Sequence, residues 1–196
     1  MERKLFGPDR KSSCGGGHDE NGGFLNNGGV YDPSADAWEL ISGDPSLSGR
    51  RSYSATWTGT HLVIWGGIDS GTGNPVNTGA RFNLQTKAWA PMTTTNAPEA
   101  RTGHSAASVN GKVVIWGGGA YDDVNAELLM FKSGAIYDPV TDSWSALTTE
   151  GAPGPRAGHI AIGAGDFMII FGGIRMPFNV MTGYYQPFFD GGIWKP

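Results

Sequence analysis

The chain has 196 residues, which is enough for a domain with a sizeable core. It contains 32 glycines and 12 prolines, whereas only 16% of its residues are charged, so many turns and few long helices are expected. The net charge of −4 is small and gives no electrostatic reason to expect nucleic acid or an anionic membrane surface as a partner.

The N-terminal segment, residues 1–10, is predicted to be a tail outside the repeated part of the chain. It carries charge but lacks the apolar core of about seven or more residues that a signal peptide needs. The longest apolar run, residues 167–171, is too short to span a bilayer. We therefore expect a soluble protein without membrane insertion, cytoplasmic as written or exported if a leader lies upstream.

A repeat of just over fifty residues fills the rest of the chain. One block has an aromatic residue followed seven positions later by tryptophan, a second begins with arginine, and a third is an apolar run that ends in two glycines. The copies of the aromatic–tryptophan block are residues 30–38, 81–89 and 136–144. The copies of the arginine block are residues 50–55, 101–106 and 156–161. The copies of the apolar block are residues 62–67, 113–118 and 168–173. Successive copies are offset by 51 and 55 residues in all blocks, which indicates a repeat architecture.

Each block predicts a β-strand. The apolar runs LVIW, VVIW and MIIF are bounded by glycine and are typical of strands covered on both faces. Small and polar residues alternate in SYSATW, as an innermost strand crowded around an axis requires. GAIYDP predicts a short strand stopped by Asp-Pro, and the tryptophan block predicts a more polar outer strand. In the order a, b, c, d these strands form a four-stranded antiparallel meander, the blade of a β-propeller.

These motifs resemble the Kelch repeat, which has a double glycine after an apolar strand, then a tyrosine, then a tryptophan about seven positions on. The resemblance covers residues 11–196, although Phe82-Asn83-Leu84 replaces Tyr-Asp-Pro in one copy. The Arg-x-Gly-His opening of strand a and the IWGG ending of strand b are similar to those of bacterial and other extended Kelch arrays. Galactose oxidase-like enzymes use similar propellers. The resemblance implies an all-β fold, a Kelch-type β-propeller of four-stranded antiparallel blades.

The array is incomplete, with about three and a half blades. We expect complete blades at 50–93 and 101–148 and partial blades at 11–43 and 156–196. Such a segment leaves two apolar blade faces bare, each beyond the few hundred Å² that monomers normally expose. Three explanations stay open: a piece of a longer propeller, a ring completed by a second chain, or a compact four-bladed ring.

Arginines and histidines recur at the start of strand a. Arg50, Arg101 and Arg156 are predicted to surround the mouth of the central channel, and His104 and His159 lie three residues further in. Such a ring suits a carboxylate or an acidic peptide. The alternative is that each arginine ties down its loop by binding main-chain carbonyls, since a residue repeated in every blade usually signals architecture.

The connections between strands b and c differ between the copies, and variable loops on a rigid frame are where binding usually resides. They are residues 68–79, 119–133 and 174–190. The candidate ligand-binding aromatics in them are Tyr121, Tyr184, Tyr185 and Phe188. Exposed aromatic side chains stack on sugar rings or anchor a protein partner. The alternative is that they fold over the open end of the propeller.

The sequence therefore predicts a non-enzymatic scaffold that binds a protein or a glycan through the face carrying the b–c and d–a loops. No catalytic residue, metal ligand or cofactor is predicted. The resemblance leaves an enzymatic alternative, a carbohydrate-directed enzyme that is either a mutarotase-like isomerase or a copper radical oxidase. The oxidases need a Cys–Tyr cross-link and a Tyr/His copper set, and the single cysteine, Cys14, stands alone near the start of the array.

Overall fold

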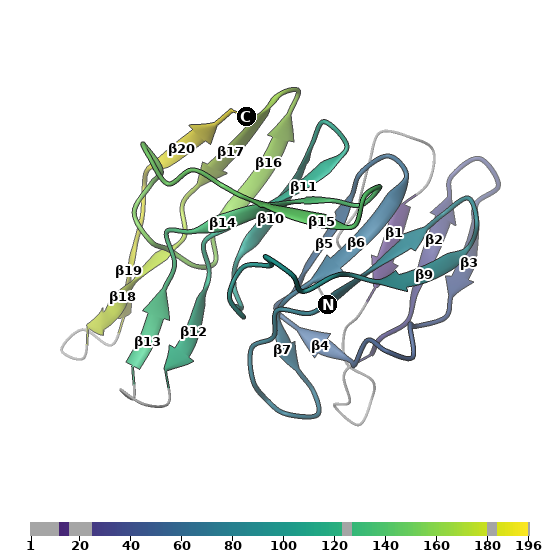
Figure 1. Cartoon of the computed structure of the whole chain (residues 1–196), viewed down its shortest axis with the longest axis horizontal. Coiled ribbons are helices and arrows are strands. Elements are labelled where there is room, and N and C mark those ends of the chain that lie inside the picture. Colours follow the sequence, from purple (N-terminus) through teal and green to yellow (C-terminus); the bar gives the residue numbers. More distant parts are fainter. Residues whose placement is uncertain (1–11, 16–24, 123–126, 180–183, 196) are drawn as a thin grey trace.

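The protein is built entirely from antiparallel β-sheets. The computed structural model describes residues 12–15, 25–122, 127–179 and 184–195. In these ranges all regular secondary structure is β-strand. Four sheets stand side by side as an arc, and three two-stranded ribbons extend from one end of them (Figure 1). The all-β propeller architecture predicted from the sequence is confirmed.

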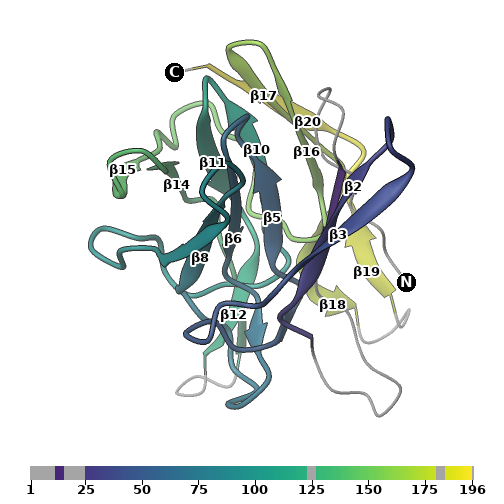
Figure 2. The ribbon, with the colours of Figure 1, turned by 90° about the vertical axis from the view of Figure 1, so that its right-hand side faces the viewer.

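The two central sheets have four strands each, in the order predicted for a blade. The second sheet consists of β5 (Ser54–Trp57), β6 (His61–Trp65), β8 (Gly79–Asn83) and β9 (Ala88–Pro91). The third consists of β10 (Ser105–Val109), β11 (Lys112–Trp116), β14 (Gly134–Asp138) and β15 (Ser143–Ala146). Their innermost strands, β5 and β10, are neighbours around the axis (Figure 2).

The two outer sheets have three strands each among the described residues. The first sheet consists of β1 (Ser12–Gly15), β2 (Gly28–Asp32) and β3 (Ala37–Ile41). The fourth consists of β16 (Ile160–Ala164), β17 (Phe167–Phe171) and β20 (Gly191–Trp194). By alignment with the central sheets, β1 corresponds to strand b of a blade and β20 corresponds to strand c.

Among the described parts of the b–c connections, those of the third and fourth sheets form β-hairpins rather than the loops that the sequence predicts. The third sheet carries the hairpin of β12 (Gly119–Asp122) and β13 (Glu127–Met130). The fourth carries β18 (Ile174–Asn179) and β19 (Tyr184–Pro187), with a bulge in its register. In the second sheet, β7 (Ile68–Asp69) pairs with β4 (Arg50–Arg51), which precedes the innermost strand.

Neighbouring sheets pack face to face through the apolar runs of their b strands. Between the second and third sheets, Val63 and Trp65 of β6 form a buried cluster with Val113, Ile115 and Tyr137. Each large apolar side chain removed from water in this way contributes about 1.5–3 kcal/mol. The same contact, with other residues, joins the first sheet to the second and the third to the fourth.

The arc does not close into a ring within the part of the chain that the structure describes, so the compact four-bladed ring is not formed. The fourth sheet packs Met168 and Ile170 against the third sheet. Its opposite surface, here called the outer face, exposes Ile160, Ile162, Phe167, Ile169, Phe171 and Ile193. None of the described residues forms a helix with the length and apolar character needed to cross a membrane.

Candidate functional site

The three repeated arginines lie in the interior of the protein. Arg50, Arg101 and Arg156 are 4%, 0% and 0% exposed. In each, Nη1 donates to two main-chain carbonyls, one at the end of strand b and one just before strand c, at 2.9–3.2 Å. The Nε atom donates to the carbonyl two residues upstream. Each guanidinium group therefore joins the d–a loop to both ends of the b–c connection.

These contacts support the structural interpretation of the arginines. Burial lowers the pKa of Arg101 to about 10, which still leaves the side chain charged at neutral pH. Arg156 forms an additional ion pair, because its Nη2 lies 2.8 Å from Oδ1 of Asp190. A charge already surrounded by main-chain acceptors has little capacity left for a ligand. Carboxylate binding by Arg50, Arg101 or Arg156 stays a prediction.

The two repeated histidines are buried between neighbouring sheets. His104 Nε2 lies 3.0 Å from Oγ of Ser54, and His159 Nε2 lies 2.6 Å from Oγ of Ser105. Each imidazole also stands edge-on to the tryptophan at the end of strand b, with 5.1 Å between ring centroids. Burial, with a smaller contribution from the charge of Arg156, lowers the pKa of His159 to about 4.

The first glycine of each pair makes room for these histidines. Gly66 and Gly117 have φ of +68° and +69°, a conformation that side chains other than glycine rarely adopt. A Cβ atom at Gly66 would lie 2.7 Å from Cε1 of His104, and one at Gly117 would lie 2.6 Å from Cε1 of His159. The glycine pair, the histidine and the arginine thus form one structural unit. A ligand-binding role for the two histidines stays a prediction.

The b–c connections and the d–a loops share one end of the protein, here called the hairpin face (Figure 1). In each of the last three sheets an antiparallel bridge ties the d–a loop to the b–c connection of the same sheet. The bridges are the β4–β7 pair, Thr102 with Gly119, and Ala157 with Ile174. The hairpin face consists of β4, β7, β12, β13, β18 and β19. Its strands β13 and β18 also contact one another.

Apolar side chains on the hairpin face are exposed to solvent. Tyr121 of β12 is 55% exposed, Leu129 of β13 is 38% exposed and Phe189, after β19, is 86% exposed. Tyr121 was predicted to bind a ligand, and the structure presents it openly. Phe189 belongs to the aromatic residues of the last connection, for which the sequence predicts a binding role, whereas Leu129 was not assigned one. Tyr184 and Tyr185 belong to strand β19, but their side chains lie outside the described part of the structure.

Phe188, another predicted contact residue, lies over a guanidinium group. Its ring centroid is 3.9 Å from Cζ of Arg156 and 5.8 Å from Cζ of Arg175. Phe131 covers Arg101 in the same way, at 4.4 Å. Both phenylalanines lie three positions before the first glycine of strand c. Aligning the copies on strand c would therefore have predicted that Phe131 and Phe188 share one role. Phe188 therefore covers the buried guanidinium group of Arg156.

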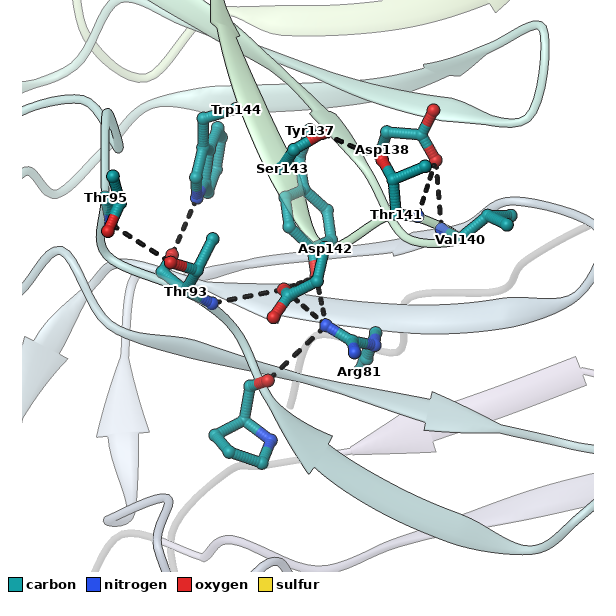
Figure 3. Close-up of polar contacts among 11 residues, drawn as sticks. Arg81, Thr93, Thr95, Tyr137, Asp138, Val140, Thr141, Asp142, Ser143 and Trp144 are labelled. Carbon is teal, nitrogen blue, oxygen red and sulfur yellow. Dashed lines mark hydrogen bonds and ion pairs between the residues drawn. The ribbon is translucent and has the colours of Figure 1, made fainter.

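A second polar network joins the second and third sheets near their outer strands (Figure 3). Arg81 Nη1 donates to the Tyr137 hydroxyl at 2.7 Å, and that hydroxyl donates to Oδ1 of Asp142 at 2.6 Å. Arg81 also forms an ion pair with Asp142. Although burial acts in the opposite direction, the hydrogen bonds from Tyr137 and Thr93 and the charge of Arg81 lower the pKa of Asp142. This network was not predicted, because its members belong to different repeat copies.

The described residues contain no group of three or more His, Cys, Asp and Glu side chains placed to hold a metal ion. Asp122 and Asp123, an acidic pair in the sequence, lie at the edge of a stretch whose side chains are not described. The described part of the hairpin face therefore presents main-chain groups, aromatic and aliphatic side chains and a few charges.

Comparisons with known proteins agree with this architecture. A profile of the KLHDC2/KLHL20/DRC7 Kelch-repeats domain matches residues 9–186. Acyl-CoA-binding domain-containing protein 5 of Arabidopsis thaliana is 31% identical over 153 residues, covering 74% of this chain and 22% of the relative. Rab9 effector protein with kelch motifs of Bos taurus is 29% identical over 165 residues, covering 81% of this chain and 42% of the relative.

The fold is also found among solved structures. The structure titled "Structure of YjhT" matches with a TM-score of 0.72 and 13% identity, over 96% of this chain and 64% of that one. The sheets therefore define a propeller of the Kelch type, and the chain belongs to the Kelch-repeat family. It spans less than half the length of the two curated relatives described above.

Proposed function

We propose that this chain is a binding scaffold for a protein partner and that it binds through the hairpin face. The observation that carries the proposal is the contrast between a repeated base and unrepeated projections. The arginine contacts are the same in three sheets. The connections held by those contacts differ in length, sequence and pairing. A rigid frame with variable connections is the usual arrangement of a binding protein.

The exposed side chains favour a protein over a sugar. Tyr121 and Phe189 offer flat rings, but Leu129 adds an aliphatic surface that does not stack on a sugar ring. Aromatic anchors with apolar surroundings are typical of protein–protein contact sites. The name of the relative Rab9 effector protein with kelch motifs also describes a protein that acts through a protein partner.

The proposal is tested by proximity labelling and affinity capture with paired variants. The double variant Tyr121→Ser, Leu129→Ser removes two apolar contacts from the hairpin face. The matched control, Val140→Ser, removes an exposed apolar side chain from a turn between strands c and d. Both variants are first shown to unfold at the same urea concentration as the wild type.

The expected result is a defined protein that is captured by the wild type and by Val140→Ser and lost with the double variant. Binding should then be measured with the purified partner, and the double variant should weaken it about tenfold or more. Equal capture by all three forms would contradict the proposal. Retention of a purified oligosaccharide that depends on Tyr121, without any protein partner, would replace it with glycan binding.

A further inference from the structure

The end of the second sheet opposite the hairpin face departs from the repeat (Figure 1). It carries the turn between β5 and β6 and the turn between β8 and β9. Trp57, the last residue of β5, stands where the third and fourth sheets have Ser108 and Gly163. A residue repeated in every sheet usually serves the architecture, so an unrepeated tryptophan indicates a role specific to this sheet.

A neutral pair replaces an ion pair at the same end of the sheet. In the third sheet Lys112, which begins strand b, has its Nζ 3.2 Å from Oδ2 of Asp138, which ends strand c. The same positions of the second sheet hold His61 and Asn83, which lie opposite each other in the β6–β8 ladder. The exchange removes the ammonium and carboxylate groups and leaves an imidazole and an amide in their place.

Hydrogen bonds fix the orientation of both side chains. Oδ1 of Asn83 accepts from the main-chain amides of Gln85 and Thr86 at 2.9 and 3.1 Å. The Nδ2 atom of Asn83 therefore faces His61 and donates to its Nε2 at 3.3 Å. An imidazole that accepts at Nε2 carries its proton on Nδ1, and this atom lies 2.9 Å from Oγ1 of Thr60.

This arrangement leaves one hydrogen-bond donor open beside an uncharged ring. Burial, with a smaller contribution from the charge of Arg81, lowers the pKa of His61, so the imidazole is neutral at neutral pH. The amide nitrogen of Asn83 has two hydrogens, and one of them bonds to His61. The other has no acceptor among the described residues and is available to a ligand.

The unrepeated residues meet around one hollow. The residues that line it include Trp57, Thr60, His61, Asn83 and Gln85. Its volume is about 450 Å³, which lies within the range of about 300–1,000 Å³ usual for ligand sites, and it opens to solvent. Trp57 also packs against the apolar cluster between the first and second sheets, so its ring is held in place. None of the described residues that line the hollow is charged.

We propose that this hollow binds a neutral saccharide. The indole of Trp57 packs against the apolar C–H face of a sugar ring. Nδ2 of Asn83 donates its open hydrogen to a hydroxyl oxygen, and the exposed amide of Gln85 donates to one hydroxyl and accepts from another. The hollow lies at the opposite end from the hairpin face, so the inference does not depend on the proposed function.

The same chemistry defines what the hollow rejects. A phosphate or a carboxylate would lose its hydration without gaining a cation from the described lining residues. A purely apolar side chain would cover the open hydrogen of Asn83 without offering it an acceptor. A ring that is apolar on one face and carries hydroxyls at its rim avoids both costs.

The test is an NMR titration of the 196-residue chain with maltotriose, cellotriose and chitotriose, and with adenosine as a flat ligand of another class. We expect saturable binding of at least one of these sugars with a dissociation constant of about 1 mM, the affinity that a few contacts to one sugar ring provide. The signals of the Trp57 indole and of the Asn83 side-chain amide should move with added sugar. The signals of the hairpin face should stay in place.

Variants that restore the repeat complete the experiment. Trp57→Ser introduces the residue of the third sheet and should weaken sugar binding about tenfold, because the ring is lost. His61→Lys combined with Asn83→Asp recreates the ion pair of the third sheet, so the fold should be kept. This double variant removes the Nδ2 donor and should also weaken binding about tenfold or more. Glu150→Gln, in a d–a loop at the opposite end, should leave binding unchanged.

Urea unfolding first shows that each variant is folded. Absence of any shift with all the sugars would overturn the inference, and so would tighter binding of adenosine than of every sugar. Full sugar binding by the folded double variant would overturn it as well, since the neutral pair would then have no part in recognition. Shifts confined to the hairpin face would have the same consequence.

Discussion

Two regions of the protein use the same repeat positions: the contact between the second and third sheets, and the outer face of the fourth sheet. The two regions differ both in how far their side chains are buried and in which residues they contain. Trp65 and Trp116 end the apolar strands of the central sheets and are 0% and 1% exposed, whereas their counterpart Phe171 is 55% exposed. All three residues are large aromatics, so the residue at this position is buried only where a neighbouring sheet covers it. The same sequence block therefore marks a core in one place and a surface in another.

The composition of the two regions differs most near the axis. Ser105, Ala107 and Lys112 face the fourth sheet from the third. At the corresponding positions the outer face has Ile160, Ile162 and Phe167. Larger apolar side chains replace small and polar ones, so the outer face is not a copy of the internal contacts. Similarity between the repeats therefore predicts the backbone of each sheet better than it predicts which neighbour, another sheet or solvent, each face of the sheet contacts.

The largest expected effect comes from removing a buried tryptophan. Trp65→Ala leaves a cavity among Trp144, Tyr137 and Ile115, and it should lower the free energy of unfolding by about 3–5 kcal/mol. Phe171→Ala at the matching position should lower it by less than about 1 kcal/mol, because the side chain is largely in water. Urea denaturation with a fixed slope measures both. Equal losses would show that the outer face is covered in solution.

The next effect concerns the buried arginines that hold the b–c connections. Arg101→Met keeps the volume of the side chain but removes the donor of the Gly117 carbonyl and one of the two donors of the Ser133 carbonyl, which keeps the Gly117 amide. We expect a loss of about 2–4 kcal/mol in the free energy of unfolding. The control Arg51→Met changes an exposed arginine and should cost less than about 0.5 kcal/mol. A neutral Arg101→Met would mean that the guanidinium contacts do not hold the loops.

A smaller effect is expected from acid. The pKa of His159 is lowered to about 4 in the folded protein, whereas an unfolded histidine has a pKa near about 6.5. As the pH falls from 6.5 to 4 the unfolded chain takes up a proton that the folded protein does not, so stability is lost in that window, at up to about 1.4 kcal/mol per pH unit. Above about pH 6.5 this contribution is fully present.

The pH effect is checked by measuring the free energy of unfolding across that window for the wild type and for His159→Gln. Glutamine retains a polar side chain for contact with Ser105 but does not titrate. The variant should therefore show a shallower loss between pH 6.5 and 4. Identical slopes in the two proteins would assign the acid sensitivity to other groups.

The smallest effect is expected at an exposed ion pair between the first and second sheets. Lys87 Nζ lies 2.6 Å from a carboxylate oxygen of Glu39, and both side chains are about half exposed. Lys87→Ala should cost about 0.2–1 kcal/mol, and the cost should shrink in 1 M salt. A loss as large as that of Trp65→Ala would contradict the view that buried apolar contacts dominate the joining of the sheets.

Much of the fold was predictable because its signals are local. The double glycines, the tyrosine or phenylalanine of strand c and the tryptophan of strand d recur at fixed positions in the sequence, so the order of the strands in each sheet can be read from them. The hairpins β12–β13 and β18–β19 were not predicted, because their short strands lack a clear alternation and their pairing depends on the bridges to the d–a loops.

The candidate site was harder to predict for a physical reason. An arginine at the start of a strand has the same sequence signature whether it faces water or main-chain carbonyls. Its acceptors are 16 and about 30 residues away in the sequence, at positions with no distinctive side chain. The exposure of Tyr121 was predictable because this residue lies in an unrepeated connection, where the frame imposes no packing role, whereas its ligand-binding role stays a prediction.

The hydrogen bond between histidine and serine joins neighbouring sheets in a fixed order. His104 bonds to Ser54 and His159 bonds to Ser105, so each sheet that carries the histidine requires a hydroxyl on the sheet before it. Ile160 stands where that hydroxyl would be needed by a following histidine. The repeats are therefore not interchangeable modules. An engineer who duplicates the third repeat behind the second preserves the pairing, whereas the same repeat placed behind the fourth would bury a histidine against isoleucine.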